Sequence, residues 1–145
     1  MKMFAVMFMF LSVITFRSCG EAEGHSYVDL RLDPVYIGET IYLTPVVTYN
    51  GIDPGTMEYN HSIARIEKVI NDSEEVVYEN KGSGTEYIMN AVLENGEEEP
   101  GETVELKLEP GLYEVHLIAD YKMQHDNGAE DTDHHHKMRQ TIEVK

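Results

Sequence analysis

Residues 103–122 read TVELKLEPGLYEVHLIADYK, and this stretch decides the fold class. Apolar and polar residues alternate on both sides of a central Glu-Pro-Gly. Alternation with a period of two is typical of a strand that buries one face, and Pro-Gly is a turn signal. The stretch therefore predicts two strands joined at a corner. The residues expected on the buried faces are Val104, Leu106 and Leu108 before the turn, and Tyr113, Val115, Leu117, Ala119 and Tyr121 after it.

The same alternation recurs along the chain from about Ser26 onward. Turn residues separate the runs, and no sustained helical period appears, so the sequence predicts an all-β antiparallel sandwich of about 7–8 strands. Pro45 interrupts one run, which predicts a bulge or a sheet edge at that residue. The expected strands outside the opening stretch are Ser26–Leu32, ending at Asp33-Pro34, then Thr40–Tyr49, Thr85–Leu93 and Met138–Val144.

Residues 61–78 allow two interpretations. Ile63, Ile66 and Ile70 have a helical spacing, which would suit a short helix over 62–70. However, a turn signal at 71–73 and a β-rich run at 75–78 follow directly. A hairpin of two strands explains both halves and is the favoured interpretation.

The corner in the opening stretch resembles the E-to-F corner of immunoglobulin-like and PKD-like bacterial domains. In those families Pro-Gly makes the turn, and the following tyrosine donates its hydroxyl to a backbone partner. The resemblance covers residues 103–145 and implies an immunoglobulin-like domain over 26–145, with Pro110, Gly111 and Tyr113 as its structural corner. The chain has no tryptophan and one cysteine, which excludes the antibody subclass.

The N-terminus predicts export. Lys2 precedes an apolar segment, Met3–Phe16, which is shorter than the about 20 residues that a membrane-spanning helix needs. Such a segment is typical of a secretory signal peptide. The following residues, Phe16-Arg17-Ser18-Cys19-Gly20, resemble the lipobox of bacterial lipoproteins. An ordinary signal peptide that happens to contain a cysteine is the alternative.

The lipobox resemblance implies a signal peptide over 1–18, a lipid on Cys19 and an acidic linker over 19–25. The lipid would hold the mature protein at a membrane in the cell envelope. The expected location is the outer membrane or cell surface of a Gram-negative bacterium.

Composition excludes several classes of protein. The chain has 27 Asp and Glu against 11 Lys and Arg, a formal charge of −16, which argues against a nucleic-acid partner. A single cysteine excludes an intrachain disulfide framework and a zinc ribbon. No common nucleophile motif occurs, so we expect no enzyme. The acidic run at 97–99 is expected to be a solvated loop, and His116 is expected on the surface.

One segment, residues 123–138, concentrates chemistry, with four of the seven histidines. On a strand, His134 and His136 would share a face, and His125 or Asp133 could complete a site for Zn²⁺, Cu²⁺ or Ni²⁺. The alternative is a solvated polar hairpin tip.

The sequence thus favours a lipid-anchored envelope protein with a non-catalytic binding or scaffolding role toward a protein or glycan partner. A metal-binding lipoprotein that uses the histidine-rich loop 125–136 is the alternative, and an accessory glycan-binding domain is a weaker one.

Overall fold

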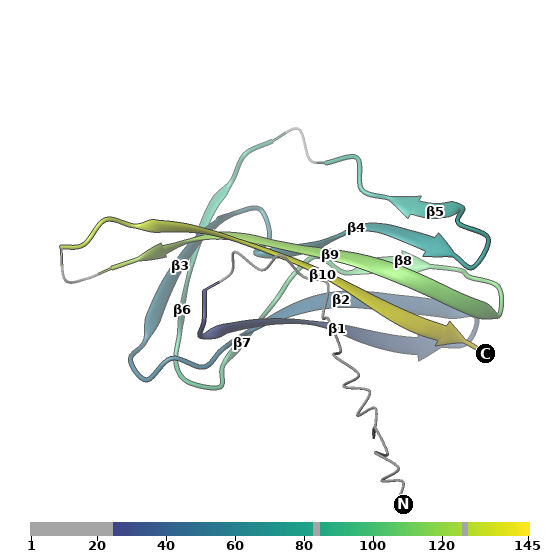
Figure 1. Ribbon diagram of the computed structural model, residues 1–145, viewed down its shortest axis with the longest axis horizontal. Helices are drawn as coiled ribbons and strands as arrows, with labels where there is room; N and C mark the ends of the chain where they lie inside the picture. Colours follow the sequence, from purple (N-terminus) through teal and green to yellow (C-terminus); the bar gives the residue numbers. More distant parts are fainter. Residues whose placement is uncertain (1–24, 83–84, 126–127) are drawn as a thin grey trace, which may run out of the picture.

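The computed structural model describes residues 25–82, 85–125 and 128–145, and every regular element in them is a β-strand (Figure 1). The predicted signal peptide, Cys19 and most of the acidic linker lie outside the described residues. The strands are β1 (Val28–Ile37), β2 (Thr40–Tyr49), β3 (Gly55–Asn60), β4 (Ala64–Asn71), β5 (Val76–Glu79), β6 (Ile88–Leu93), β7 (Glu98–Pro100), β8 (Val104–Leu106), β9 (Gly111–Gln124) and β10 (Thr132–Val144).

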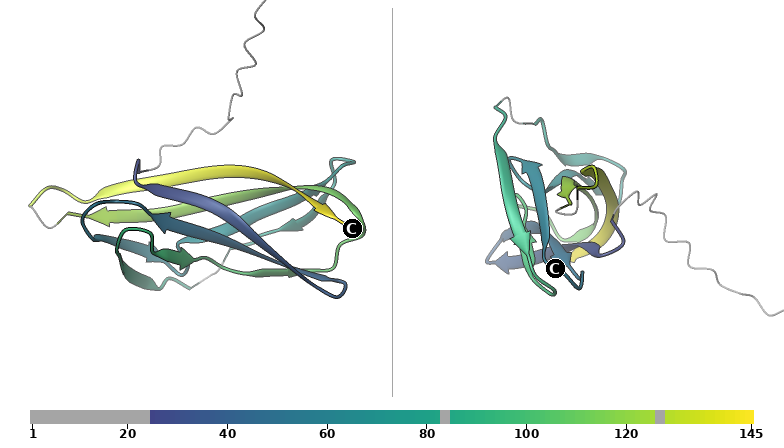
Figure 2. Two further views of the ribbon diagram at one scale, coloured as in Figure 1. Left: turned by 90° about the horizontal axis from the view of Figure 1, so that it is seen from below. Right: turned by 90° about the vertical axis from the view of Figure 1, so that its left-hand side faces the viewer.

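Two antiparallel sheets lie face to face, so the predicted all-β sandwich is confirmed (Figure 2). In the first sheet, β2 pairs with β1 on one side and with β7 and β8 on the other. In the second sheet, β9 pairs with β10 along one side and with β4 and β3 along the other. Strand β5 lies beyond β4, and β6 lies beyond β3.

The described residues form ten strands rather than the seven or eight predicted, because β3 and β7 were expected to be loops. The turn signals at 50–55 prevented the prediction of β3, although its Met57 and Tyr59 alternate inward and are buried. The acidic run at 97–99 prevented the prediction of β7. Glu98 and Glu99 accept hydrogen bonds from Arg31 Nη2 at 2.8 Å and from the Tyr59 hydroxyl at 2.7 Å. The expected loop is therefore wrong for these two residues, whereas Glu97 and Glu98 are exposed as expected.

The two prolines interrupt the strands less than predicted. Strand β1 continues through Asp33-Pro34, because it borders its sheet and a border strand tolerates proline. The β1–β2 register is unbroken, so Pro45 makes no bulge. On its other side, β8 ends its pairing at Leu43 and β7 begins at Val46, which leaves Pro45 at the break between them.

The predicted hairpin is confirmed as β4 and β5, and the pairing of β4 with β9 shifts register between Ile66 and Lys68. A strand without a bulge would turn Ile66 and Val69 to opposite faces. The shift adds one residue, so both are fully buried on the same face.

Apolar side chains from both sheets fill the space between them. All five predicted inward residues of β9 are buried, as expected. The hydrogen bond that the resemblance implied is also present: the Tyr113 hydroxyl donates to the Glu109 carbonyl at 2.6 Å. Gly111, at the start of β9, has φ +155°, which favours glycine.

His116 is only 8% exposed, so the prediction that it lies on the surface was wrong. Its side chain does point away from the core, on the outer face of the second sheet. However, β9 is flanked on both sides, and His116 is in register with Lys68 on β4 and Arg139 on β10. Long flanking side chains cover a central outer position. His116 Nε2 also lies 2.5 Å from Glu114 Oε1.

Candidate functional site

Two groups of polar side chains lie near one end of the β9–β10 hairpin, on opposite faces of the second sheet. Pairing in the antiparallel ladder places His134 opposite Tyr121 and His136 opposite Ala119 on the inner face. The same ladder places His135 opposite Asp120 on the outer face. The predicted separation of His135 from the other two histidines is therefore confirmed.

The inner group is centred on Tyr121, whose ring stacks against both His134 and His136. Its hydroxyl lies 2.7 Å from His136 Nε2, and the backbone N–H of His25 donates to the same nitrogen at 3.2 Å. The His25 ring meets His134 edge to face at a centroid distance of 5.0 Å. The segment before β1 is thus held against the sandwich by histidines. We name residues His25, Tyr121, His134 and His136 the inner histidine cluster.

Within the inner histidine cluster, the surroundings of His25 and His136 favour neutral imidazoles. Burial lowers the pKa of His136, and the neighbouring His134 and His135 lower it further, against an opposing effect from Asp29. Burial also lowers the pKa of His25, with His134 and His125 adding to the effect. Burial raises the pKa of the Tyr121 hydroxyl well above its usual value, so this group is a proton donor at neutral pH.

The predicted metal ligands are only partly brought together. His134 and His136 share the inner face, but alternation places Asp133 on the outer face. His125 Nε2 lies 3.2 Å from Thr132 Oγ1, and that hydroxyl lies 2.7 Å from His134 Nε2, so a threonine separates the two rings. Within residues 25–82, 85–125 and 128–145, no three His, Cys, Asp or Glu side chains are grouped so as to hold a metal ion.

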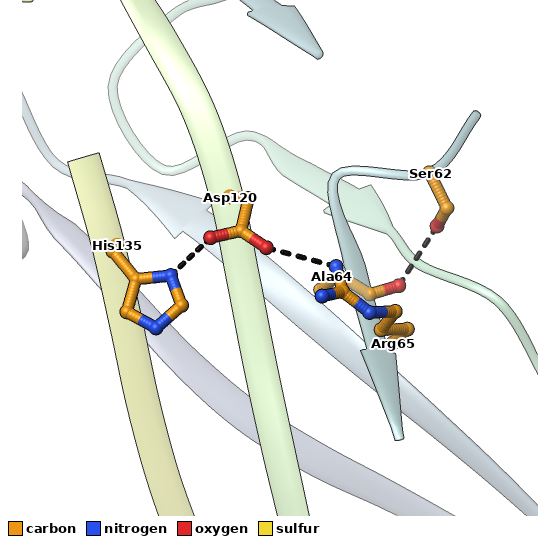
Figure 3. A network of polar contacts seen from close by, with 5 residues as sticks. All are labelled: Ser62, Ala64, Arg65, Asp120 and His135. Atoms are coloured by element: carbon orange, nitrogen blue, oxygen red, sulfur yellow. Dashed lines mark hydrogen bonds and ion pairs between the residues drawn. The ribbon is translucent and has the colours of Figure 1, made fainter. Parts of the chain in front are cut away.

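The outer group is a chain of three polar side chains from three strands, Arg65, Asp120 and His135, which we name the outer triad (Figure 3). Asp120 on β9 contacts Nδ1 of His135 on β10 through one oxygen, and Arg65 Nη1 on β4 through the other at 2.8 Å. A carboxylate on Nδ1 fixes the orientation of an imidazole and leaves Nε2 facing outward as the reactive nitrogen. Arg65 fixes the carboxylate in turn.

A hollow of about 470 Å³ lies beside the outer triad. Its lining mixes carboxylates, an amide, an ammonium group and an imidazole with one exposed apolar side chain, Ile88. Such a surface presents hydrogen-bond donors and acceptors in fixed positions beside a small apolar area. The lining residues are Glu58, Tyr59, Asn60, Ile88, Asp120, Tyr121, Lys122, Asp133, His134 and His135.

No sequence motif indicated the outer triad. Arg65, Asp120 and His135 are far apart in the chain, and only the registers of β4, β9 and β10 bring them together. Alternation alone places Asp120 and His135 on outward positions. The sequence does not specify the pairing register of β9 and β10, and a shift of one residue would separate Asp120 from His135.

Tyr59, which also lines the hollow, links the two sheets at this end of the molecule. Burial and its hydrogen bond to Glu99 raise the pKa of Tyr59 to about 12. Its hydroxyl therefore stays protonated and donates to the Glu99 carboxylate on β7. This contact connects Tyr59, a residue that lines the hollow, to the opposite sheet.

No protein-family model matches this chain, and the curated proteins searched contain no match to it. Among the described residues, no helix is both long and apolar enough to span a bilayer.

Proposed function

We propose that this chain is a lipid-anchored protein of the cell envelope whose β-sandwich binds a partner without catalysing a reaction. The hollow beside the outer triad carries the binding role. Four strands contribute to its lining, and Arg65 and Asp120 hold His135 in one orientation before any ligand arrives. Preorganised polar groups of this kind favour binding because little side-chain freedom is lost on association.

The anchor is supported by the sequence ahead of the domain. The cysteine in the lipobox-like run is the only one in the chain, and His25, the first residue that the structure describes, follows it by six residues. A lipid on Cys19 would hold the sandwich close to the membrane surface. Removal of residues 1–18 would take away Lys2 and Arg17 and leave the mature chain at a charge of −18.

The anchor is tested by fractionation of the producing cells. We expect the wild-type chain to sediment with membranes and to be released by detergent but not by salt. Cys19→Ser should remove the lipid and shift the protein out of the detergent-released fraction. An unchanged distribution of this variant would contradict the lipid anchor.

The binding role is tested with partners from the envelope. Polysaccharide and protein fractions of the envelope are applied separately to the immobilised chain, and the retained material is compared between variants. His135→Ala removes the outward imidazole, whereas Thr141→Ala changes an exposed residue of the same strand outside the hollow. We expect His135→Ala to lower retention of one fraction at least fivefold and Thr141→Ala to leave it unchanged. Equal retention by both variants would contradict a role for the hollow.

A metal-binding function is the second candidate, and the position of His134 and His136 on the same face of β10 favours it. Neutral imidazoles are good ligands for Zn²⁺, Cu²⁺ and Ni²⁺. Calorimetry with each ion tests this function. Micromolar binding that disappears in the His134→Ala/His136→Ala double variant would support it, and the absence of binding would end it.

A further inference from the structure

Strand β6 forms a border of the second sheet, with β3 on one side and no described strand on the other (Figure 2). Two side chains on its outer face are strongly exposed, Ile88 at 73% and Val92 at 62%. A border strand presents unpaired N–H and C=O groups, and an apolar one is a ready template for a further strand. Natural proteins usually protect such borders with charged residues or proline.

Backbone N–H and C=O groups of β6 point alternately toward β3 and toward the open side, and one hydrogen bond shows which residues point which way. The N–H of His61 donates to the Tyr87 carbonyl at 2.8 Å, so the backbone groups of Tyr87 point toward β3. Because these directions alternate along a strand, the groups of Ile88, Asn90 and Val92 point away from β3, toward the open side. The side chains of the same three residues lie on the outer face, in register with Asn60, Glu58 and Thr56.

Charge distinguishes β6 from the other border strands. Its sequence, IMNAVL, contains no charged residue. The remaining described border strands, β1, β5, β7, β8 and β10, each carry at least one Asp or Glu. Two copies of a chain with a charge of −16 repel one another, and like charges on facing strands oppose pairing. The open side of β6 is therefore the described border whose own strand residues bring no charge into contact with a second copy.

The geometry points to a symmetric dimer in which β6 of one copy pairs antiparallel with β6 of a second copy, with Asn90 on the two-fold axis. An isologous contact needs a self-complementary pattern. The outer face of β6 has one, because Ile88 and Val92 are placed symmetrically about Asn90. In this register Ile88 lies opposite Val92 of the second copy, and Asn90 lies opposite Asn90.

The directions of the backbone groups of β6 support the same register. Residues 88, 90 and 92 have their free groups on the open side, so all three form hydrogen-bonded pairs across the axis. Directly opposed residues share a face of the sheet, which keeps both sandwiches on the same side of the joined sheet. The dimer extends the second sheet through both molecules and covers the two most exposed apolar residues of the strand.

Mass measurement tests the dimer with the full chain in a non-ionic detergent. We expect light scattering, with the detergent mass subtracted, to give twice the mass of a single chain at high concentration. Val92→Lys places a charge on the paired border and should give a monomer. Val76→Lys is the matched control on β5, where Val76 is also exposed at 51%, and this variant should stay dimeric. A monomer for wild type at every concentration would overturn the proposal, even if β6 binds an extended peptide of another protein.

Disulfide trapping tests the register. Both variants carry Cys19→Ser, so that the introduced cysteine is unique. The Cα atoms of a directly opposed hydrogen-bonded pair are about 5.5 Å apart, which lies within the range for a disulfide. Asn90→Cys should therefore give a covalent dimer under mild oxidation, while Ala91→Cys, one residue along and on the inner face, should give at least tenfold less. Equal trapping of the two variants would overturn the proposed register.

Discussion

The hydroxyl of Tyr121 lies 2.7 Å from Nε2 of His136, and the backbone N–H of His25 reaches the same nitrogen at 3.2 Å. A backbone N–H can only donate, so His136 Nε2 must accept and its proton must be on Nδ1. Protonation of Nε2 would break the contact with His25. The docking of the N-terminal segment on the sandwich therefore requires a neutral His136.

This relationship gives the stability of the domain a defined pH dependence. The pKa values of His136 and His25 are lowered in the folded chain, so the unfolded chain binds more protons below its ordinary histidine pKa. The free energy of unfolding should be highest above pH 6.5 and should fall as the pH drops through the folded values. Urea denaturation at pH 7.5, 6.5 and 5.5 measures it. His136→Gln should reduce the slope, and a stability that rises toward pH 5.5 would contradict the neutral cluster.

The corner before β9 should contribute measurably to stability. Tyr113→Phe removes the donor to the Glu109 carbonyl and keeps the buried ring. We expect a loss of about 1–2 kcal/mol in the free energy of unfolding, because a part-buried hydrogen bond is lost. Tyr36→Phe is the matched control, since its hydroxyl also donates to a backbone carbonyl, that of Glu143, but at an exposed position. Equal losses in the two variants would show that the corner has no special role.

Two leucines of β9 test which face of the strand supports the core. Leu117 is 1% exposed and Leu112 is 52% exposed. Leu117→Ala should cost about 2–5 kcal/mol by leaving a cavity, whereas Leu112→Ala should cost about 0.5 kcal/mol or less. Chemical denaturation of both variants at neutral pH checks the difference. Similar costs in the two variants would contradict the placement of Leu117 on the buried face of β9 and of Leu112 on its outer face.

The outer triad should matter for binding more than for stability. The side chains of Arg65 and Asp120 are 39% and 43% exposed, and ion pairs at such positions contribute about 0–1 kcal/mol. Asp120→Asn should therefore leave the melting temperature nearly unchanged while it releases His135 and lowers partner retention as His135→Ala does. A large loss of stability in this variant would assign the triad to the fold instead of the site.

Sequence patterns predicted most of the fold because one buried face imposes a period of two. This rule correctly placed all five inward residues of β9 and separated His135 from His134 and His136. It failed where local chemistry opposed the pattern, in β3 with its turn residues and in β7 with its glutamates. It also failed for His116, because neighbouring strands rather than alternation decide whether an outward residue is covered.

The candidate site was less accessible from the sequence. The histidine-rich segment indicated His134 and His136, but the polar contacts that join β4, β9 and β10 run through Asp120 and His135. Those contacts depend on which residue of β9 faces His135 and on the position of Arg65 one strand away. Both are set by strand register, which needs the whole sandwich.

The lipid anchor is tested by the mass of the protein recovered from membranes of its producing cells. We expect a chain that begins at Cys19, lacks residues 1–18 and carries the added mass of fatty acyl chains on that cysteine. An intact chain, or one that begins elsewhere with Cys19 unmodified or absent, would contradict a lipid-anchored envelope protein.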